Sequence, residues 1–173
     1  MIKLLRKRRS IRKFTAEKIT PESIETLIEA ALRAPSSRGT NPWEFILVDD
    51  PEMLGKLSKA KRHGSEFLKN APLAIVVCAD STKSDAWIED CSIAAIIIQL
   101  TALSLNLGSC WAHIRDRQHD NELTAEGYIQ ELLGLPEHIK VECILGIGHP
   151  AEEKQPVPAD KLQRDKIRSN RWS

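Results

Sequence analysis

A dense basic segment near the start of the chain holds the residues best suited to chemistry. Seven of the first thirteen residues are lysine or arginine, and Arg8-Arg9-Ser10-Ile11-Arg12 combines three guanidinium groups with a hydroxyl. The planar fork of arginine matches phosphate oxygens, and a serine hydroxyl adds a neutral donor. A solvated basic arm or a nucleic-acid tail is the more usual meaning of a short basic run. The segment therefore predicts a phosphate clamp, with those two alternatives open.

Charge is distributed unevenly along the rest of the chain. The 173 residues carry a net charge of only +1, but five basic residues fall within residues 161–173. Residues 14–160 carry 13 basic and 23 acidic residues. If the fold brings the two basic ends together, both can act on one anionic group. A protein that wraps nucleic acid more often spreads positive charge over its body, so this pattern disfavours a nucleic-acid partner.

Cysteine and histidine spacing predicts no metal site. The five histidines lack zinc spacing, and no C-x-x-C occurs among the four cysteines, Cys78, Cys91, Cys110 and Cys143. Three of these cysteines lie in apolar runs, as reduced buried thiols of cytoplasmic proteins do. The start shows no signal-peptide pattern. The longest apolar stretch, residues 91–105, is too short to span a bilayer. We expect a cytoplasmic protein with no membrane partner.

Helices and strands alternate along the chain. Thr20-Pro21-Glu22 begins a helix with one apolar face, which Pro35 stops at Ala34. The apolar run Leu73–Cys78 predicts a strand buried on both faces. Further strands are expected at residues 44–48, 110–114 and 141–147, and further helices at 51–61, 65–69, 85–106 and 123–133. This order predicts three layers, in an α/β or α+β arrangement, without a Rossmann or P-loop nucleotide motif.

Several segments, taken in order, resemble the nitroreductase family of FMN-dependent oxidoreductases, most of all its short members. Besides residues 8–14, they are residues 34–45, 67–72, 87–94, 108–111, 145–154 and 170–172. The resemblance implies an α+β fold with a central mixed, mainly antiparallel sheet flanked by helices. It also implies an intertwined homodimer. Residues 1–173 would form a single FMN-binding domain, in which 151–173 is a tail that packs on the body or on the partner chain.

The same resemblance assigns the basic residues to the cofactor FMN. Arg8 and Ser10 would contact its phosphate and ribityl chain. Arg12 would place positive charge near the N1/O2 edge of the ring, where reduction builds negative charge. Arg9 fits the same patch, although a solvated charge is an equal alternative for it. From the tail, Arg171 and Arg168 would return to the phosphate.

The loop from Pro35 to Asn41 resembles the segment that reaches the flavin of the other subunit. Its candidate contacts are Pro35, Ser36, Ser37, Arg38 and Asn41. An ordinary connection is the alternative, because these are simply turn-forming residues. Gly39 and Asn41 stand where the family more often has Asn and Gln, so Gly39 lacks a side-chain contact and Asn41 keeps a shorter amide.

Trp111 and His113 would lie along the flavin ring. A main-chain N–H near His113 is expected to point at flavin N5, the atom that takes the hydride, so no side chain is predicted to be catalytic. A packing role for the His113 imidazole is favoured over acid–base catalysis. His63 and Gly64 fall in a loop that lies near the cofactor in relatives.

The resemblance implies an NAD(P)H-dependent flavin oxidoreductase. A hydride from NADH or NADPH would reach FMN, and two electrons would pass to a nitroaromatic or quinone in ping-pong order. The short segment 115–121 predicts an open site without lid helices. The apolar helix at 85–106 suits a homodimer interface, with a monomer's buried helix as runner-up. A non-catalytic FMN- or phospholigand-binding sensor or carrier, and a basic-armed nucleic-acid-binding protein, remain as alternatives.

Overall fold

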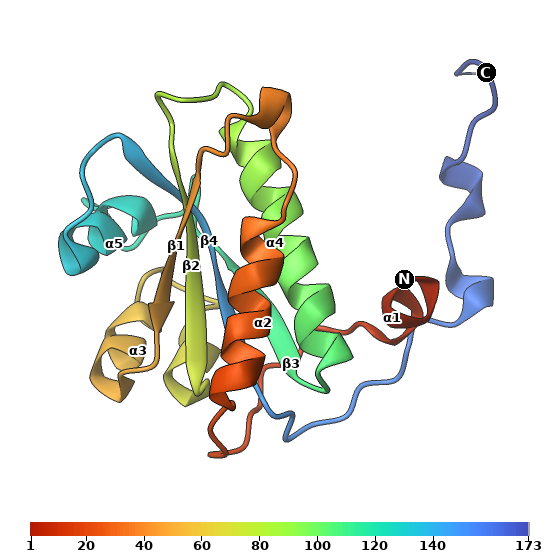
Figure 1. Cartoon of the computed structure of the whole chain (residues 1–173), viewed down its shortest axis with the longest axis horizontal. Helices are drawn as coiled ribbons and strands as arrows, with labels where there is room; N and C mark the ends of the chain where they lie inside the picture. The colour runs from red at the N-terminus through yellow and green to blue at the C-terminus, as the bar shows by residue number, and fades with distance from the viewer. Residues whose placement is uncertain (173) are drawn as a thin grey trace.

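An antiparallel sheet of four strands forms the centre of the computed structural model, which describes residues 1–172 (Figure 1). The strands are β1 (Trp43–Val48), β2 (Leu73–Asp80), β3 (Gly108–His113) and β4 (Ile139–Gly148), in the order β1-β2-β4-β3. All three strand pairs are antiparallel. Outside the four strands, Ser10 forms an isolated parallel bridge with Ser109. The expected α+β class with a mainly antiparallel sheet is confirmed.

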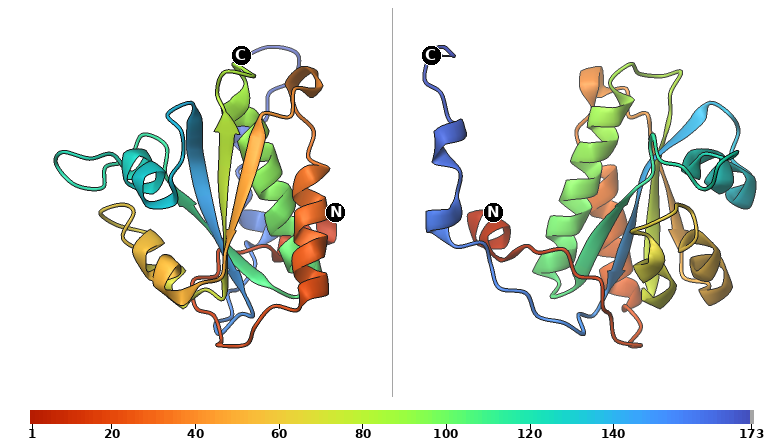
Figure 2. Two further views of the ribbon diagram at one scale, coloured as in Figure 1. Left: turned by 60° about the vertical axis from the view of Figure 1, so that its left-hand side comes forward. Right: turned by 180° about the vertical axis from the view of Figure 1, so that it is seen from behind.

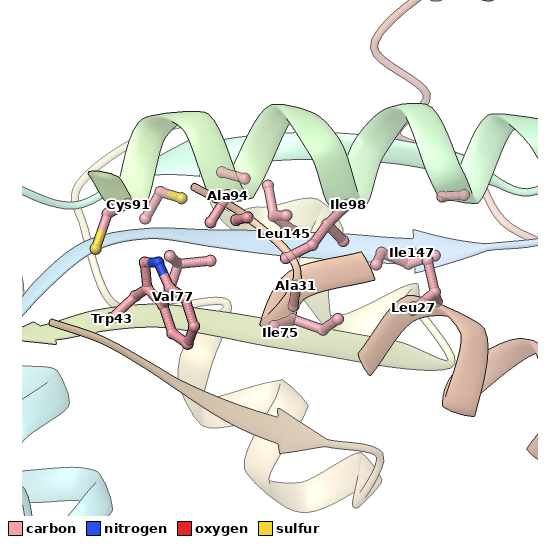
Figure 3. Packing of buried hydrophobic residues seen from close by; sticks show 14 of the residues in the cluster. Leu27, Ala31, Trp43, Ile75, Val77, Cys91, Ala94, Ile98, Leu145 and Ile147 are labelled. Atoms are coloured by element: carbon pink, nitrogen blue, oxygen red, sulfur yellow. The ribbon is translucent and has the colours of Figure 1, made fainter. Parts of the chain in front are cut away.

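Helices cover both faces of the sheet (Figure 2). One face carries α2 (Pro21–Leu32) and α4 (Trp87–Ser104), and the other carries α3 (Pro51–Leu57), the 3-10 helix η2 (Glu66–Asn70) and α5 (Ala125–Leu133). Figure 3 shows Leu27, Ala31 and Ile98 packed over Ile75 and Leu145 on the first face. The outer segments are α1 (Ile2–Lys7), η1 (Ser37–Gly39), η3 (Ala159–Lys161) and η4 (Arg164–Lys166).

Local signals in the sequence explain where the helices begin. The Thr20 hydroxyl accepts a hydrogen bond from the Ser23 amide at 3.2 Å, and Pro21 occupies the first turn of α2. Thr124 caps α5 through the Gly127 amide at 3.0 Å. Gly134 then ends α5 with a φ of 67°, a left-handed conformation that favours glycine.

Several helix boundaries differ from the sequence-based expectation. α2 ends at Leu32, two residues before the expected Ala34, because the Ala34 amide bonds the Ala31 carbonyl in a tighter turn. α3 ends at Leu57 instead of Lys61, since residues 58–60 form tight turns against it. α4 covers 87–104 and not 85–106. The sequence reasoning did not predict α1, in which half of the residues are basic and no side chain is buried.

α4 is the longest and most apolar helix of the described chain. By length and composition alone it could cross a membrane, but 44% of its 18-residue window is buried here, and the core helix of a soluble protein passes the same test. One face packs on the sheet and on α2, through residues such as Cys91, Ala94 and Ile98 (Figure 3). On the other face Ile93 is 40% exposed and Ile96 is 37% exposed.

The start and the end of the fold lie side by side. The Thr15 amide donates to the His149 carbonyl at 2.9 Å, and the Ala151 amide donates to the Lys13 carbonyl at 2.9 Å. Residues 155–172 are exposed and run past α1, away from the sheet (Figure 2). In a single chain the far tail therefore lies apart from the body.

Candidate functional site at the edge of the sheet

The basic N-terminal segment lies along the free edge of β3. The Ile11 amide donates to the Ser109 carbonyl at 2.9 Å, next to the bridge between Ser10 and Ser109. A side chain on Gly108 would not fit, because an added Cβ would lie 2.8 Å from Cγ2 of Ile11. Glycine therefore allows the segment to approach the strand closely.

Lys154 and Glu152, which follow β4 in the sequence, hold this segment in place. The Lys154 Nζ donates to the Ser10 carbonyl at 2.7 Å and lies 3.2 Å from Glu152. A Glu152 carboxylate oxygen accepts the Arg12 amide at 2.6 Å and the Lys13 amide at 3.3 Å. The Arg12 hydrogen bond holds the pKa of Glu152 below its ordinary value, so the carboxylate stays charged. The sequence reasoning missed both roles. Its one signal was the family-like segment at 145–154.

A cationic cleft of about 510 Å³ opens beside these contacts. Arg8, Arg9, Lys154 and Ser109 line it, with Pro150, Pro156 and the end of α4. The Arg9 guanidinium contacts the Gln155 carbonyl. Within residues 1–172, Arg8 has no carboxylate at ion-pair distance. Positive charge in excess of its acidic partners, together with a serine, suits a phosphate group.

The Arg12 side chain lies on a different side of the segment from the Arg8 side chain. It lines a separate hollow with Lys13 and Phe14. Its charge acts on Cys110 and Lys61, although burial is the dominant cause of the raised pKa of Cys110 and of the lowered pKa of Lys61. The structure thus separates the cluster into Arg8 and Arg9 on one side and Arg12 on the other. The division between a phosphate end and a ring end stays a prediction.

β3 presents alternate backbone groups to its open edge. Ser109, Trp111 and His113 stand opposite Ile147, Leu145 and Cys143 of β4. In an antiparallel strand the N–H and C=O of one residue point to the same side, and successive residues alternate. Because the Ser109 carbonyl faces Ile11, the N–H groups of Trp111 and His113 face that same edge. The two rings stack on one face with centroids 6.4 Å apart.

His113 lies beside a buried carboxylate that the sequence reasoning did not identify. Glu142 is 3% exposed, and its Oε1 lies 3.6 Å from Nδ1 of His113. Its Oε2 lies 3.3 Å from Nε of Arg115, without hydrogen-bond geometry. Burial raises the pKa of Glu142 and lowers the pKa of His113, so the imidazole is neutral at neutral pH.

A β-bulge gives Glu142 this unusual place. Val77 and Cys78 of β2 pair with Cys143 and Val141, so Glu142 has no partner on β2. Its carbonyl instead accepts the amides of Ile114 and Arg115, at 3.1 and 3.3 Å. Bulges often redirect a side chain next to a functional site.

The loop predicted to reach a partner's cofactor lies at the other end of α4. The Ser37 amide donates to Oδ1 of Asp90 at 2.8 Å, and Asp90 is 2% exposed. The Asn41 amide donates to the Ser36 hydroxyl at 2.8 Å, and Arg38 pairs with Asp85 at 2.6 Å. An 18-residue helix is about 27 Å long, and Arg8 lines a cleft at the opposite end of α4 from this loop. In one chain the loop is therefore far from α1 (Figure 1).

One chain therefore brings together only part of the predicted site. Six predicted residues gather around β3, namely Arg8, Arg9, Ser10, Arg12, Trp111 and His113. The loop residues Pro35, Ser36, Ser37, Arg38 and Asn41 lie elsewhere. Arg168 and Arg171 belong to the exposed tail, where the Arg168 guanidinium lies 5.2 Å from the centre of the Trp172 ring. Residues 1–172 contain no cluster of three or more His, Cys, Asp or Glu side chains that would hold a metal ion.

Comparison with known proteins assigns the chain to a family. The model of the nitroreductase family matches residues 5–64 and 52–149. A solved FMN-dependent nitroreductase from Clostridium difficile is 48% identical, with a TM-score of 0.98, and the match covers 99% of this chain and 100% of that one. A protein of Archaeoglobus fulgidus, provisionally named NADH dehydrogenase/NAD(P)H nitroreductase, is 40% identical over 99% of this chain and 98% of its own length.

A more distant solved structure has the same fold. The NADPH:FMN oxidoreductase of Vibrio harveyi, complexed with NAD⁺, is 26% identical with a TM-score of 0.80, over 99% of this chain and 77% of that one. The chain belongs to the nitroreductase family, and the resemblance seen in its motifs is confirmed.

Proposed function

We propose that this protein is an FMN-dependent oxidoreductase that takes a hydride from NADH or NADPH and then reduces a second substrate, such as a nitroaromatic or a quinone, in ping-pong order. The observation that carries this proposal is the cleft of excess positive charge beside an open strand edge. Relatives named as an FMN-dependent nitroreductase and as an FMN reductase [NAD(P)H] support the cofactor and the activity.

The residues around β3 divide the binding of FMN between them. Arg8 and Ser10, with Lys154 beside them, would hold the phosphate and the ribityl chain. Arg12 would place its charge at the ring. The outward N–H of His113 would donate to the edge of the ring where the hydride arrives. FMN, when bound, supplies a two-electron carrier, and the chain positions it and stabilises its negative charge.

A homodimer would complete the site. Ile93 and Ile96 leave an apolar face of α4 uncovered in one chain, which favours burial against a second copy. If two α4 helices pack antiparallel about a two-fold axis, the start of one lies beside the end of the other. The loop of residues 35–41 of one protomer would then reach β3 of its partner.

The tail fits the same arrangement. We propose that residues 1–173 form one FMN-binding domain whose tail, residues 151–173, packs on the partner chain. In the tail, Ile167 is 78% exposed and Trp172 is 85% exposed. Burial of these two apolar side chains against a partner chain would stabilise the assembly. Arg168 and Arg171 would then supply positive charge to a phosphate. Residues 114–124 contain no helix, which supports an open site.

We also place the protein in the cytoplasm, because its thiols suit a reducing compartment. All four cysteines are free and buried. Burial raises the pKa of Cys78 to about 12, so its thiol is unreactive at neutral pH.

The proposal is tested by colour and then by reduction. Purified protein is expected to be yellow, or to turn yellow with added FMN, and to elute as a dimer. Anaerobic NADH or NADPH should bleach the flavin rapidly, and a nitroaromatic should restore the colour. A colourless protein that ignores FMN would contradict the proposal. A yellow protein that neither nucleotide bleaches would instead be a flavin carrier.

A further inference from the structure

A second cationic hollow lies beyond the other end of β3. Two loops build it, residues 58–65 and residues 114–124. The Arg62 amide donates to the Gln118 carbonyl at 3.2 Å, and the Arg62 guanidinium donates to the Asp120 carbonyl at 2.8 Å and to Oδ1 of Asn121 at 2.5 Å. These contacts join the loops and use donor groups of the Arg62 guanidinium.

Further contacts hold the two loops together. Nδ1 of His119 lies 2.9 Å from the Lys59 carbonyl, and the His119 ring stacks on Tyr128 with centroids 4.1 Å apart. The Arg117 carbonyl accepts the Ala125 amide at 2.9 Å, which fixes this loop to the start of α5. The two loops therefore present their side chains from a held backbone, as a binding site requires.

The hollow has a volume of about 390 Å³, and its charge is not balanced. Its lining residues are Lys61, Arg62, His63, Asp116, Arg117 and Gln118. Within residues 1–172, neither Lys61 nor Arg117 has a carboxylate at ion-pair distance. Asp116 contacts Arg115, and Glu66 accepts the Gly64 amide at 2.7 Å. The nearby acids are thus already engaged.

The cations also act on one another. Burial lowers the pKa of Lys61, and the charge of Arg117 lowers it further. Arg117 likewise adds to the effect of burial on His113. Like charges held this close repel, and an anion bound between them would remove the repulsion.

The place of the hollow indicates which anion would bind. It follows directly after His113, whereas the cleft at Arg8 and Lys154 lies beside Ser109. The two hollows share no lining residue, so each can hold an anion of its own. A second anion at this end of β3 would come with a reactant.

We propose that Lys61 and Arg117 bind an oxyanion carried by a reactant, either a phosphate of the nicotinamide nucleotide or a carboxylate of the electron acceptor. This inference rests on the proposed function and adds a substrate class to it. In a ping-pong reaction the two reactants use one face in turn, so one cationic hollow serves either of them.

The test measures each half-reaction alone, with reactants that differ in charge. Reduction of the bound flavin is followed anaerobically with NADPH, with NADH and with the uncharged donor 1-benzyl-1,4-dihydronicotinamide. Reoxidation is followed with 4-nitrobenzoate and with the neutral 4-nitrobenzamide. The variants are Lys61→Gln, Arg117→Gln and the double variant. Lys69→Gln is the control, because Lys69 is an exposed lysine outside the hollow.

We expect each variant to lower the second-order rate constant about tenfold for the anionic reactant it binds, the size of one charge-assisted hydrogen bond. Rates with the neutral analogues, and rates in Lys69→Gln, should not change. A loss only with NADH and NADPH identifies the nucleotide phosphates, and a loss only with 4-nitrobenzoate identifies the acceptor's carboxylate.

Other results would overturn the inference. Equal losses with neutral and anionic reactants would mean that the two residues act on the flavin or on the fold. Weaker FMN retention would place them in the cofactor site, and unchanged rates throughout would leave them without this role. In all three cases wild-type bleaching by the neutral donor still supports the proposed function, so failure of the two ideas can be told apart.

Discussion

Arg8 and Arg12 lie four residues apart, yet they face different chemical groups. Arg8 lines the cleft with Lys154, whereas Arg12 lies near Cys110 and Lys61. The Glu152 carboxylate causes this separation by holding the Arg12 amide at 2.6 Å and fixing the direction of the segment. Under the proposed function, a short peptide would thereby supply charge to two parts of one cofactor.

Replacement of Arg12 tests the role proposed for it at the ring. Arg12→Ala should weaken FMN binding about tenfold, since one charge-assisted hydrogen bond is lost, and should slow reduction by NAD(P)H. Fluorescence titration with FMN and anaerobic stopped-flow measure the two effects. Lys18→Ala is the control, because Lys18 is exposed and lines neither hollow. Unchanged flavin content and rate in Arg12→Ala would refute the role.

Glu142 gives stability a pH dependence of unusual sign for a carboxylate. Its pKa in the folded chain is raised above the ordinary 4.5, so above pH 4.5 the folded chain binds more protons there than the unfolded chain. Stability from this group therefore falls as pH rises through that window. Glu142→Gln should remove the fall, as measured by urea unfolding at several pH values.

His113 contributes with the opposite slope and needs its own control. Its folded pKa lies below the ordinary 6.5, so its contribution to stability is lost as pH falls below 6.5. The Glu142 effect is therefore read from the difference between Glu142→Gln and wild type, with the exposed Glu131→Gln as reference. Identical pH slopes in Glu142→Gln and wild type would contradict the assignment.

At the scale of elements, the N-terminal segment depends on the bare backbone at the start of β3. An alanine at Gly108 would put its Cβ 2.8 Å from Ile11, so Ile11 must move. Because Ser10 and Arg12 flank Ile11, the whole cationic segment would move with it.

Gly108→Ala should therefore cost about 1–3 kcal/mol in the free energy of unfolding, the usual size of overpacking. It should also weaken FMN binding. Adding Ile11→Ala should recover part of both losses by making room. The control is Gly55→Ala in α3, where an added Cβ meets nothing within 4 Å. Equal stability of Gly108→Ala and Gly55→Ala in urea titrations would count against the close contact.

The elements themselves were largely predictable. The spacing of apolar residues predicted α2, the stop at Gly134 predicted the end of α5, and the run at Leu73–Cys78 predicted the strand β2. The α1 helix was not predictable, because its basic residues bury no face that periodicity could reveal. Its place depends on the segment that follows it.

The site was less predictable than the fold, for a physical reason. Arg8, Ser10 and Arg12 were identifiable because they are adjacent in sequence. Lys154 acts on Ser10 only through folding, as Glu142 does on His113. The family-like segment 145–154 includes Lys154 but does not reveal this contact, and no local pattern marks Glu142. The bulge that buries Glu142 is a property of strand register, which the sequence pattern did not specify.

At the scale of the whole molecule, the uncovered face of α4 is the feature that one chain does not explain. Ile93 and Ile96 are large apolar side chains in the middle of the longest helix, and both are more than one-third exposed. Predicted cofactor contacts lie at both ends of that helix. Assembly and cofactor binding should therefore depend on each other.

Charge introduced on this face should separate the subunits. In the proposed homodimer, Ile96→Glu should give a monomer, because two carboxylates would face each other near the two-fold axis without water. It should lose FMN at the same time. Light scattering after size exclusion, with absorbance at flavin wavelengths, reports both. Leu47→Glu is the control, since Leu47 on β1 has the same exposure of 37%.

This interface would be excluded if the Ile96→Glu variant remained dimeric, or if the wild-type protein were a monomer that retains flavin.

The hydrogen bonds that join the two ends of the fold also determine when the site can form during synthesis. Lys154 and Ser10 are 144 positions apart, Glu152 and Arg12 are 140 apart, and Arg9 and Gln155 are 146 apart. On the ribosome the arginines emerge first and wait for partners that are made more than a hundred residues later. A nascent chain halted before residue 150 would hold most of its sheet and no cofactor. Flavin uptake would thus require synthesis to pass residue 155.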